Sequence, residues 1–479
     1  MNNSIDSTKL AGVLRTLDKS QRLAAKKFLE SPYFNKSKEI IILFLEILKL
    51  QEKEKPLDKV KLWKKIVQNK PYNDLRFRKF CSDLSKLIER FLAQQAFEED
   101  PLQMKLFLLT KLSQQEQRAQ KSSKTTTNLS KKMIQNHPYR DHSYFLYRYQ
   151  LQRSFYDLEN FGTKRGVRSN IEEISSSLDS FYIGEKLRLI TDAESRKSLK
   201  AREYEIAFTD TILQLAQSSV AEKDHLPHID IYLQIYQLLS NSNADESYFR
   251  LKELIKENAH LFPQEVAIEE LYGAAQNYCV KKINSGDRSF LNELFELFKL
   301  QIEQSLLLSD GRLSPWYFRN IIVVALRLGE YDWVEDFINR FKDDLPESHK
   351  ENAVTYNMAQ LYFYQKKYNK VLEQLRFVEY DDMSYNLNSK VMLMLTYYEL
   401  DEFDLLDSHL DTFEVFLKRR KDFTADRKQI YIWLIKYTRR LTRIIPSDKK
   451  ALQKLKEDIQ STKGVVNANW LLEKIAELE

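Results

Sequence analysis

The seven histidines are the first side chains in this sequence to test for chemistry, because histidine binds metals and transfers protons near neutral pH. Two of them, His225 and His228, are spaced so that one helical turn would present both to a metal ion. Pro227 lies between them and is typical of the entrance to a helix, so we expect no zinc site here. We also find no GxxxxGK[ST], GxGxxG, HExxH or GxSxG motif.

Paired carboxylates are the other familiar catalytic pattern. Asp343-Asp344 and Asp381-Asp382 both fall in predicted turns, where acidic residues cap helices. With 69 acidic residues in the chain, such pairs are expected by chance. We therefore predict no catalytic residue, no metal and no cofactor, and expect a protein that is not an enzyme.

The two cysteines, Cys81 and Cys279, are far apart and neither belongs to a CxxC pair. This pattern predicts two reduced thiols and excludes a disulfide framework and a cysteine zinc site. Residues 1–10 are polar, and the most apolar run, 40–48, is interrupted by Glu46 and too short to cross a bilayer. We expect a cytoplasmic protein without a membrane span.

Charge is distributed unevenly along the chain. Residues 1–200 carry 39 Lys/Arg against 24 Asp/Glu, whereas residues 201–400 carry 20 against 31. Such asymmetry is compatible with a nucleic-acid partner, an acidic protein partner, or contact between the basic and acidic segments. The residues that would bind nucleic acid are basic and crowd one N-terminal stretch: Lys61, Lys64, Lys65, Arg76, Arg78 and Lys79.

Two further basic stretches have a composition that suits the same role. One is residues 418–421 with several arginines and lysines up to residue 443, and the other is 139–156, where arginines alternate with aromatic residues. Stacking on aromatics and neutralisation of phosphates is how single strands are bound. However, the aromatics of 139–156 fall on a helical core stripe. Solvated charge or contact with the acidic segment is therefore favoured over nucleic acid.

The elements that position these residues are predicted to be helices. Glycine and proline number only 9 and 10 in 479 residues, far too few for a β-rich or dinucleotide-binding fold. Apolar residues recur every three or four positions, as in 75–92, and Asp18 with Gln21 suggests a capping box. We expect an all-α protein with an N-terminal helical domain over 1–100 and a helical-repeat region over 101–479.

Three C-terminal segments repeat one pattern around Tyr331, Tyr368 and Phe403, which lie 37 and 35 residues apart. The pattern resembles the tetratricopeptide-repeat (TPR) family, whose helical hairpins recur at about 34 residues. Gly329 falls on the family's turn glycine and is expected to end its helix in the left-handed conformation. Lys366 and Asp401 replace that glycine in the next two repeats. The resemblance is clearest over 314–412, and the whole chain is also similar to uncharacterised bacterial TPR-like proteins.

This resemblance implies a right-handed α-solenoid whose concave groove is lined by the first helix of each pair. It assigns partner contacts to residues at the groove positions of three successive repeats: Trp316, Arg319 and Arg327, then Tyr356, Gln360 and Tyr364, then Asn388, Leu395 and Tyr398. Several of these are also compatible with ordinary packing. The basic positions that clamp a C-terminal carboxylate in chaperone-associated members are replaced by Val391 and Leu395, so that partner is not expected.

The function expected from these patterns is a non-catalytic scaffold that holds a protein or peptide in the groove. The alternatives are an RNA- or DNA-binding helical-repeat protein that uses the basic N-terminal half, and an enzyme of unrecognised type. The identity of the partner and the oligomeric state do not follow from the sequence.

Overall fold

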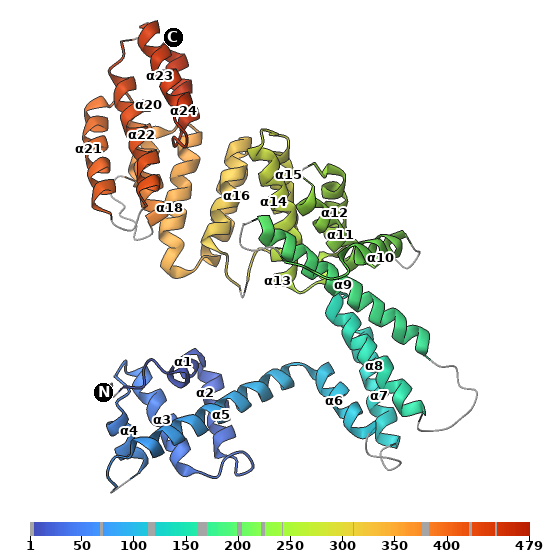
Figure 1. The fold of residues 1–479 in the computed structure, drawn as a ribbon. Helices are drawn as coiled ribbons and strands as arrows, with labels where there is room; N and C mark the ends of the chain where they lie inside the picture. The colour runs from blue at the N-terminus through green and yellow to red at the C-terminus, as the bar shows by residue number, and fades with distance from the viewer. Residues whose placement is uncertain are drawn as a thin grey trace. The chain divides into compact units, whose positions relative to one another are not determined.

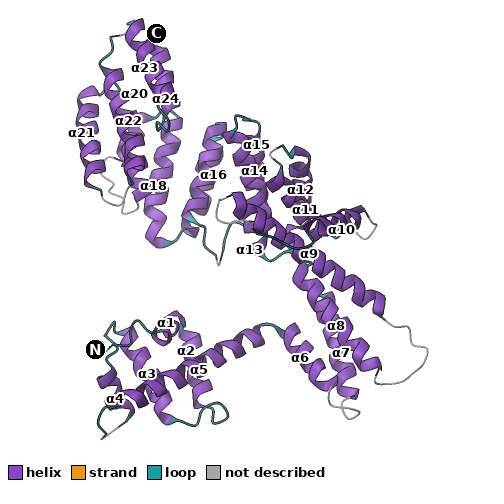
Figure 2. Ribbon diagram, in the orientation of Figure 1, coloured by secondary structure: helices purple, strands orange, loops and turns teal. Residues whose placement is uncertain are grey.

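The computed structural model describes residues 4–67, 70–113, 120–160, 170–198, 204–221, 226–241, 243–309, 311–375, 383–420, 424–445 and 448–479. Within these segments every regular element is a helix, and the only β pairing consists of two isolated bridges, with no strand (Figure 2). The all-α expectation is confirmed. Contacts between Cα atoms divide the chain into two compact units, 1–186 and 187–479, which we describe separately.

The first unit contains eight complete helices among its described residues and the beginning of a ninth (Figure 1). Their bounds are α1 (Lys9–Thr16), α2 (Lys19–Glu30), α3 (Lys38–Glu52), α4 (Lys59–Ile66), α5 (Asp74–Glu99), α6 (Pro101–Ser113), α7 (Gln120–Gln135), α8 (His142–Asn160) and α9 (Ile171–Ser198). The predicted domain boundary at residue 100 is the break between α5 and α6, whereas the contact-based division falls inside α9.

Helices α1 to α5 enclose one hydrophobic core, to which the predicted stripe of α5 contributes Leu84, Ile88 and Phe91. The capping box at the start of α2 is confirmed. The Gln21 amide donates to Asp18 Oδ1 at 2.8 Å, and the Asp18 amide donates to Gln21 Oε1 at 3.1 Å. Local sequence signals therefore set both the start and the buried face of these helices.

Helices α6 to α8 form a second cluster, in which Leu151 and Phe155 of α8 are buried. Tyr144 and Tyr147 pack against the same cluster, and the Tyr147 hydroxyl donates to Asp100 Oδ2 at 2.5 Å. The aromatic stripe of 139–156 therefore serves packing, as predicted. These rings are engaged with protein neighbours, which argues against their use for stacking on bases.

The second unit continues from α9 through α10 (Thr209–Ala221), α11 (Pro227–Ser240), α12 (Asp245–Asn258), α13 (Gln264–Val266), α14 (Gly273–Asn284), α15 (Phe290–Glu303), α16 (Pro315–Leu328), α17 (Tyr331–Phe341), α18 (Glu347–Tyr364), α19 (Tyr368–Leu375), α20 (Met383–Glu399), α21 (Phe403–Arg419), α22 (Ala425–Thr442), α23 (Lys449–Ser461) and α24 (Ala468–Leu478). Consecutive helices pack in pairs, such as α11 with α12, α14 with α15 and α18 with α19 (Figure 1). The first helix of one pair also contacts the first helix of the next, since α16 packs on α18 and α18 on α20.

The turns of three successive pairs have the same geometry. Gly329, Lys366 and Asp401 have φ values of 81°, 58° and 57°, in the left-handed region. The amide of the residue that follows each of these three donates to a carbonyl five residues earlier, as from Glu330 to Ala325 at 3.0 Å and from Glu402 to Tyr397 at 3.0 Å. This is the Schellman pattern. The predicted role of Gly329 is confirmed, and the other two turns keep it without glycine.

The left-handed backbone of these turns predicts that two substitutions change the stability of their helix pairs in opposite directions. Gly329→Ala is expected to destabilise its helix pair by about 1 kcal/mol, because a Cβ disfavours left-handed backbone. No heavy atom lies within 4 Å of that Cβ, so crowding adds nothing. Asp401→Gly is expected to stabilise its pair by up to about 1 kcal/mol, because it removes the same strain. Native-state hydrogen exchange of the flanking helices measures both effects, and changes of the same sign would contradict this account of the turns.

Buried tyrosine hydroxyls tie the earlier helix pairs together. Two tyrosine–lysine pairs, each one helical turn apart, hold a carboxylate of a neighbouring helix: Tyr248 and Lys252 bind Glu293, and Tyr278 and Lys282 bind Asp245. The hydroxyl–carboxylate distances are 3.0 and 2.6 Å, and the ammonium–carboxylate distances are 2.7 and 2.9 Å. Burial raises the pKa of both tyrosines, so both hydroxyls stay protonated and donate.

Candidate binding surfaces

Residues predicted to line the groove meet across the first helices of two successive pairs. The Arg319 guanidinium of α16 lies over the Tyr356 ring of α18, 5.8 Å from its centroid. Burial raises the pKa of Tyr364, and Arg327 lies near enough to oppose that shift. In both pairs the residues are 37 positions apart, which is also the spacing of the first two repeats. Helices α16 and α18 therefore run side by side in the repeat register.

The side chains that remain accessible on these helices form what we call the first-helix face. Its members are exposed or half-buried residues of α16, α18 and α20: Trp316, Arg319, Arg327, Gln360, Tyr364 and Asn388. Trp316 is the most prominent, with 68% of its surface exposed, and Tyr364 is 40% exposed. Large exposed aromatics beside arginine are typical anchors of protein interfaces.

Gln360 adds an unpaired acceptor to the first-helix face. Among the described residues, its Oε1 is buried and accepts no hydrogen bond. Asn357, one turn earlier on α18, also has a buried side-chain oxygen, Oδ1, that accepts no hydrogen bond from the described residues. The Nδ2 atom of Asn357 donates to Ala353 O at 2.7 Å. An unpaired buried acceptor costs about 1–3 kcal/mol.

Three of the predicted contacts are packing residues instead. The Tyr356 ring is only 2% exposed and packs against Tyr385 of α20, with centroids 5.2 Å apart. Tyr398 packs against Trp470 of α24 at 5.1 Å and belongs to the rim of the C-terminal core. Leu395, 4% exposed, lies in that core as well. These side chains support neighbouring helices, and a partner does not reach Tyr356 or Leu395 without rearrangement.

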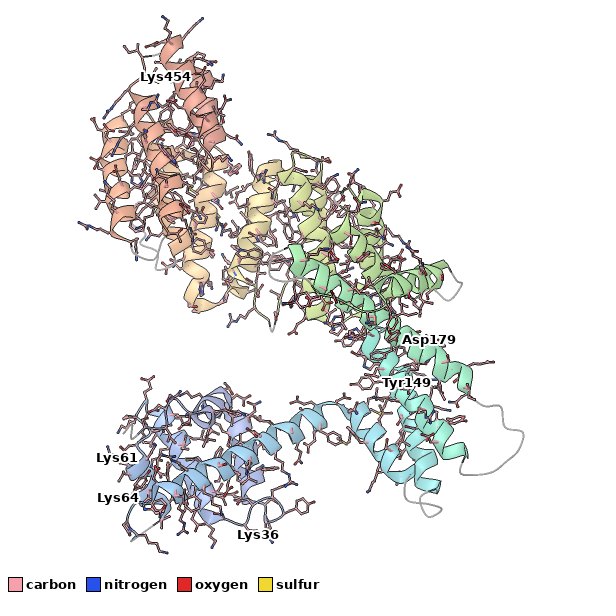
Figure 3. All side chains as sticks on the ribbon, viewed as in Figure 1. Lys36, Lys61, Lys64, Tyr149, Asp179 and Lys454 are labelled. Carbon is pink, nitrogen blue, oxygen red and sulfur yellow. The ribbon has the colours of Figure 1, made fainter. Side chains whose placement is uncertain are left out.

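The six N-terminal basic residues are all exposed. Lys61, Lys64 and Lys65 project from α4, and Figure 3 shows the first two close together at the outer edge of their unit. Arg78 pairs with Asp74 one turn earlier at 2.7 Å, and Arg76 lies over the Phe80 ring at 5.5 Å. The three lysines have no ion pair among the described residues.

The C-terminal basic cluster has a different environment. Lys418 and Arg439 share Glu414, at 2.7 and 3.0 Å, and Arg440 pairs with Asp458 at 2.6 Å. Lys421 lies outside the described residues. Three of the described side chains of this second cluster are therefore paired with carboxylates.

The candidate metal and thiol groups are consistent with structural roles. Pro227 is the first residue of α11, which confirms the predicted helix entrance, and His228 is buried behind it, while His225 lies outside the described residues. No group of three metal-binding side chains occurs in the described segments. Burial raises the pKa of Cys81 to about 11 and that of Cys279 to about 12, so both are thiols at neutral pH. None of the helices in the described segments is long and apolar enough to cross a bilayer.

Comparison with known proteins adds no assignment, since neither protein-family models nor curated proteins give a match. One residue of this region was not predicted: Tyr385, which extends the packed line from α18 to α20. It lies three residues before Asn388, so helical spacing from that predicted position was the available signal.

Proposed function

We propose that the protein is a non-catalytic scaffold, a right-handed TPR-like solenoid that binds a protein or peptide segment along the first-helix face. The observation that carries the proposal is the contact of the Arg319 guanidinium of α16 with the Tyr356 ring of α18. It joins successive helix pairs at the repeat spacing, and the charge of Arg327 acts on Tyr364 at the same spacing. The recurring Schellman turns at Gly329, Lys366 and Asp401 support the same repeat.

The chemistry of the face suits a segment that carries apolar and polar groups together. Trp316 offers a large apolar ring, and Arg327 and Arg319 offer hydrogen-bond donors. Tyr356 supports the Arg319 guanidinium from below, which restricts its motion before a partner arrives. Preorganised side chains lose less conformational entropy on binding.

Partner capture from the protein's own cells tests this function. Trp316→Ala combined with Arg327→Ala removes two accessible anchors and is expected to reduce recovery of nuclease-resistant partners at least tenfold, because such anchors each contribute about 2 kcal/mol. The matched control is Leu405→Ala with Val415→Ala, two exposed side chains of α21, a second helix of its pair. The control is expected to recover partners as the natural chain does.

Both double variants must retain the circular dichroism spectrum of the natural chain, which shows that their helices still form. Equal recovery with both variants contradicts binding at the first-helix face. Loss of all partners on nuclease treatment contradicts the scaffold function itself.

A further inference from the structure

One short stretch of the N-terminal unit has a high density of positive charge. Between residues 59 and 79 there are eight Lys/Arg and one Asp/Glu. This stretch contains α4 and the first turns of α5. Its exposed basic side chains form what we call the α4–α5 basic face: Lys61, Lys64, Lys65, Lys70, Arg76, Arg78 and Lys79.

The fold holds these side chains outward. Leu62, Trp63 and Ile66 of α4 are buried, so the lysines occupy the solvent side of the helix. The Trp63 ring contacts Phe80 of α5 with centroids 6.3 Å apart, so the two helices meet at this ring pair. Only Arg78 has an ion pair on this face, with Asp74, among the described residues. Similar charges at this density repel one another unless a polyanion neutralises them.

The composition of the α4–α5 basic face distinguishes between three possible partners: a membrane surface, an acidic protein and a nucleic acid. A membrane-surface helix needs an exposed apolar side, but the apolar side of α4 is buried in the core. A protein interface is typically depleted in lysine and centred on aromatic anchors. Here Leu75 is the single large hydrophobic residue of 59–79 that is mostly exposed, at 82%. A lysine-rich surface without an apolar centre fits a phosphate backbone best.

We propose that the α4–α5 basic face binds the phosphate backbone of nucleic acid without reading its sequence. The aromatic residues that would stack on bases are engaged elsewhere: Trp63 and Phe77 are 1% exposed, and Tyr72 donates to Asp74 at 2.7 Å. Binding through phosphates alone depends steeply on salt and little on sequence. The inference is independent of the scaffold function, because it uses a different unit of the chain.

Fluorescence anisotropy of the full chain with a labelled random-sequence 24-base-pair DNA duplex tests the proposal. K61Q/K64Q/K65Q is expected to weaken binding at least tenfold at 100 mM NaCl and to reduce the slope of log K against log salt by about 2 to 3, roughly 0.9 per lost phosphate contact. The control is K449Q/K450Q/K454Q on α23, which makes the same change in charge at three exposed lysines. It is expected to change affinity less than twofold.

The proposal is overturned by equal weakening in the two triple variants, or by no binding of the natural chain at 50 mM NaCl. Binding to phosphatidylserine vesicles or to polyglutamate but not to the duplex also overturns it, in favour of a membrane or an acidic protein. Trp316→Ala with Arg327→Ala is expected to bind the duplex normally. Failure of that variant to capture proteins therefore has no bearing on this surface.

Discussion

Lys474→Ala is expected to lower the free energy of unfolding of the C-terminal helices by about 3–5 kcal/mol, because it leaves a buried carboxylate without its cation. The Lys474 side chain is 8% exposed and that of Glu399 is 14% exposed. Their charged groups lie 3.0 Å apart, and Lys474 also contacts Glu477 at 2.9 Å. Trp470 Nε1 donates to the same Glu399 at 2.8 Å. This network fastens α24 to α20.

We expect the free energy of unfolding to fall because the compensating charge is removed, and not because side-chain volume is lost. Glu399→Gln combined with Lys474→Met keeps the packing volume without charges and is expected to be more stable than Lys474→Ala alone. Lys456→Ala is the control, because its pair with Glu479 is longer, at 3.5 Å, and both side chains are more than a third exposed. That pair is expected to contribute at most about 1 kcal/mol.

The pH range over which Lys474 acts follows from its pKa. Burial alone would lower the pKa of Lys474, but hydrogen bonds to Glu477 and Glu399 outweigh burial and raise it. A raised pKa stabilises the fold below the unfolded value of about 10.4 and loses its effect only as pH rises further. Native-state hydrogen exchange of α20 and α24 at pH 7 therefore measures the full difference. The network is refuted if Lys474→Ala costs no more than Lys456→Ala.

Trp63→Ala is expected to destabilise the α1–α5 core by about 3–5 kcal/mol. Trp63 is 1% exposed, packs against Tyr72 at 5.9 Å, and donates from Nε1 to Lys70 O at 3.0 Å. Trp316→Ala removes the same side chain from a site that is 68% exposed and is expected to cost about 0.5 kcal/mol or less. The two variants distinguish Trp63, which stabilises a hydrophobic core, from Trp316, which is accessible to a partner.

Hydrogen exchange of α3 to α5 and of α16 measures both effects in one experiment. Similar losses of protection in the two variants would contradict the distinction. A large loss at α16 would also show that Trp316→Ala is unsuitable for testing the first-helix face. In that event Arg327→Ala alone, on an exposed side chain, is the replacement.

The helices were predictable because their signals are local. The capping box at Asp18, the stripe of α5 and the left-handed Gly329 follow from residues within a few positions of one another. The turns at Lys366 and Asp401 were harder, because neither residue favours left-handed backbone. There the packing of the joined helices and the Schellman hydrogen bonds outweigh the local preference.

The candidate surface was predictable only in part. Arg319, Arg327 and Tyr364 keep part of their surface accessible, which agrees with their predicted positions on the first helices. Tyr356 is buried because its ring fills the space between α18 and α20, and that space depends on how the helices cross. The network around Lys474 joins residues 75 positions apart, so no local sequence pattern predicts it.

Site-specific photo-crosslinking in the protein's own cells tests the central claim most directly. A benzophenone side chain in place of Tyr364 is accessible on the first-helix face, and one in place of Leu405 is accessible on α21, a second helix of its pair. We predict a protein adduct from position 364 that survives nuclease treatment, with little or none from position 405. Equal adducts from both positions, or none from position 364, would contradict a partner bound along the first helices.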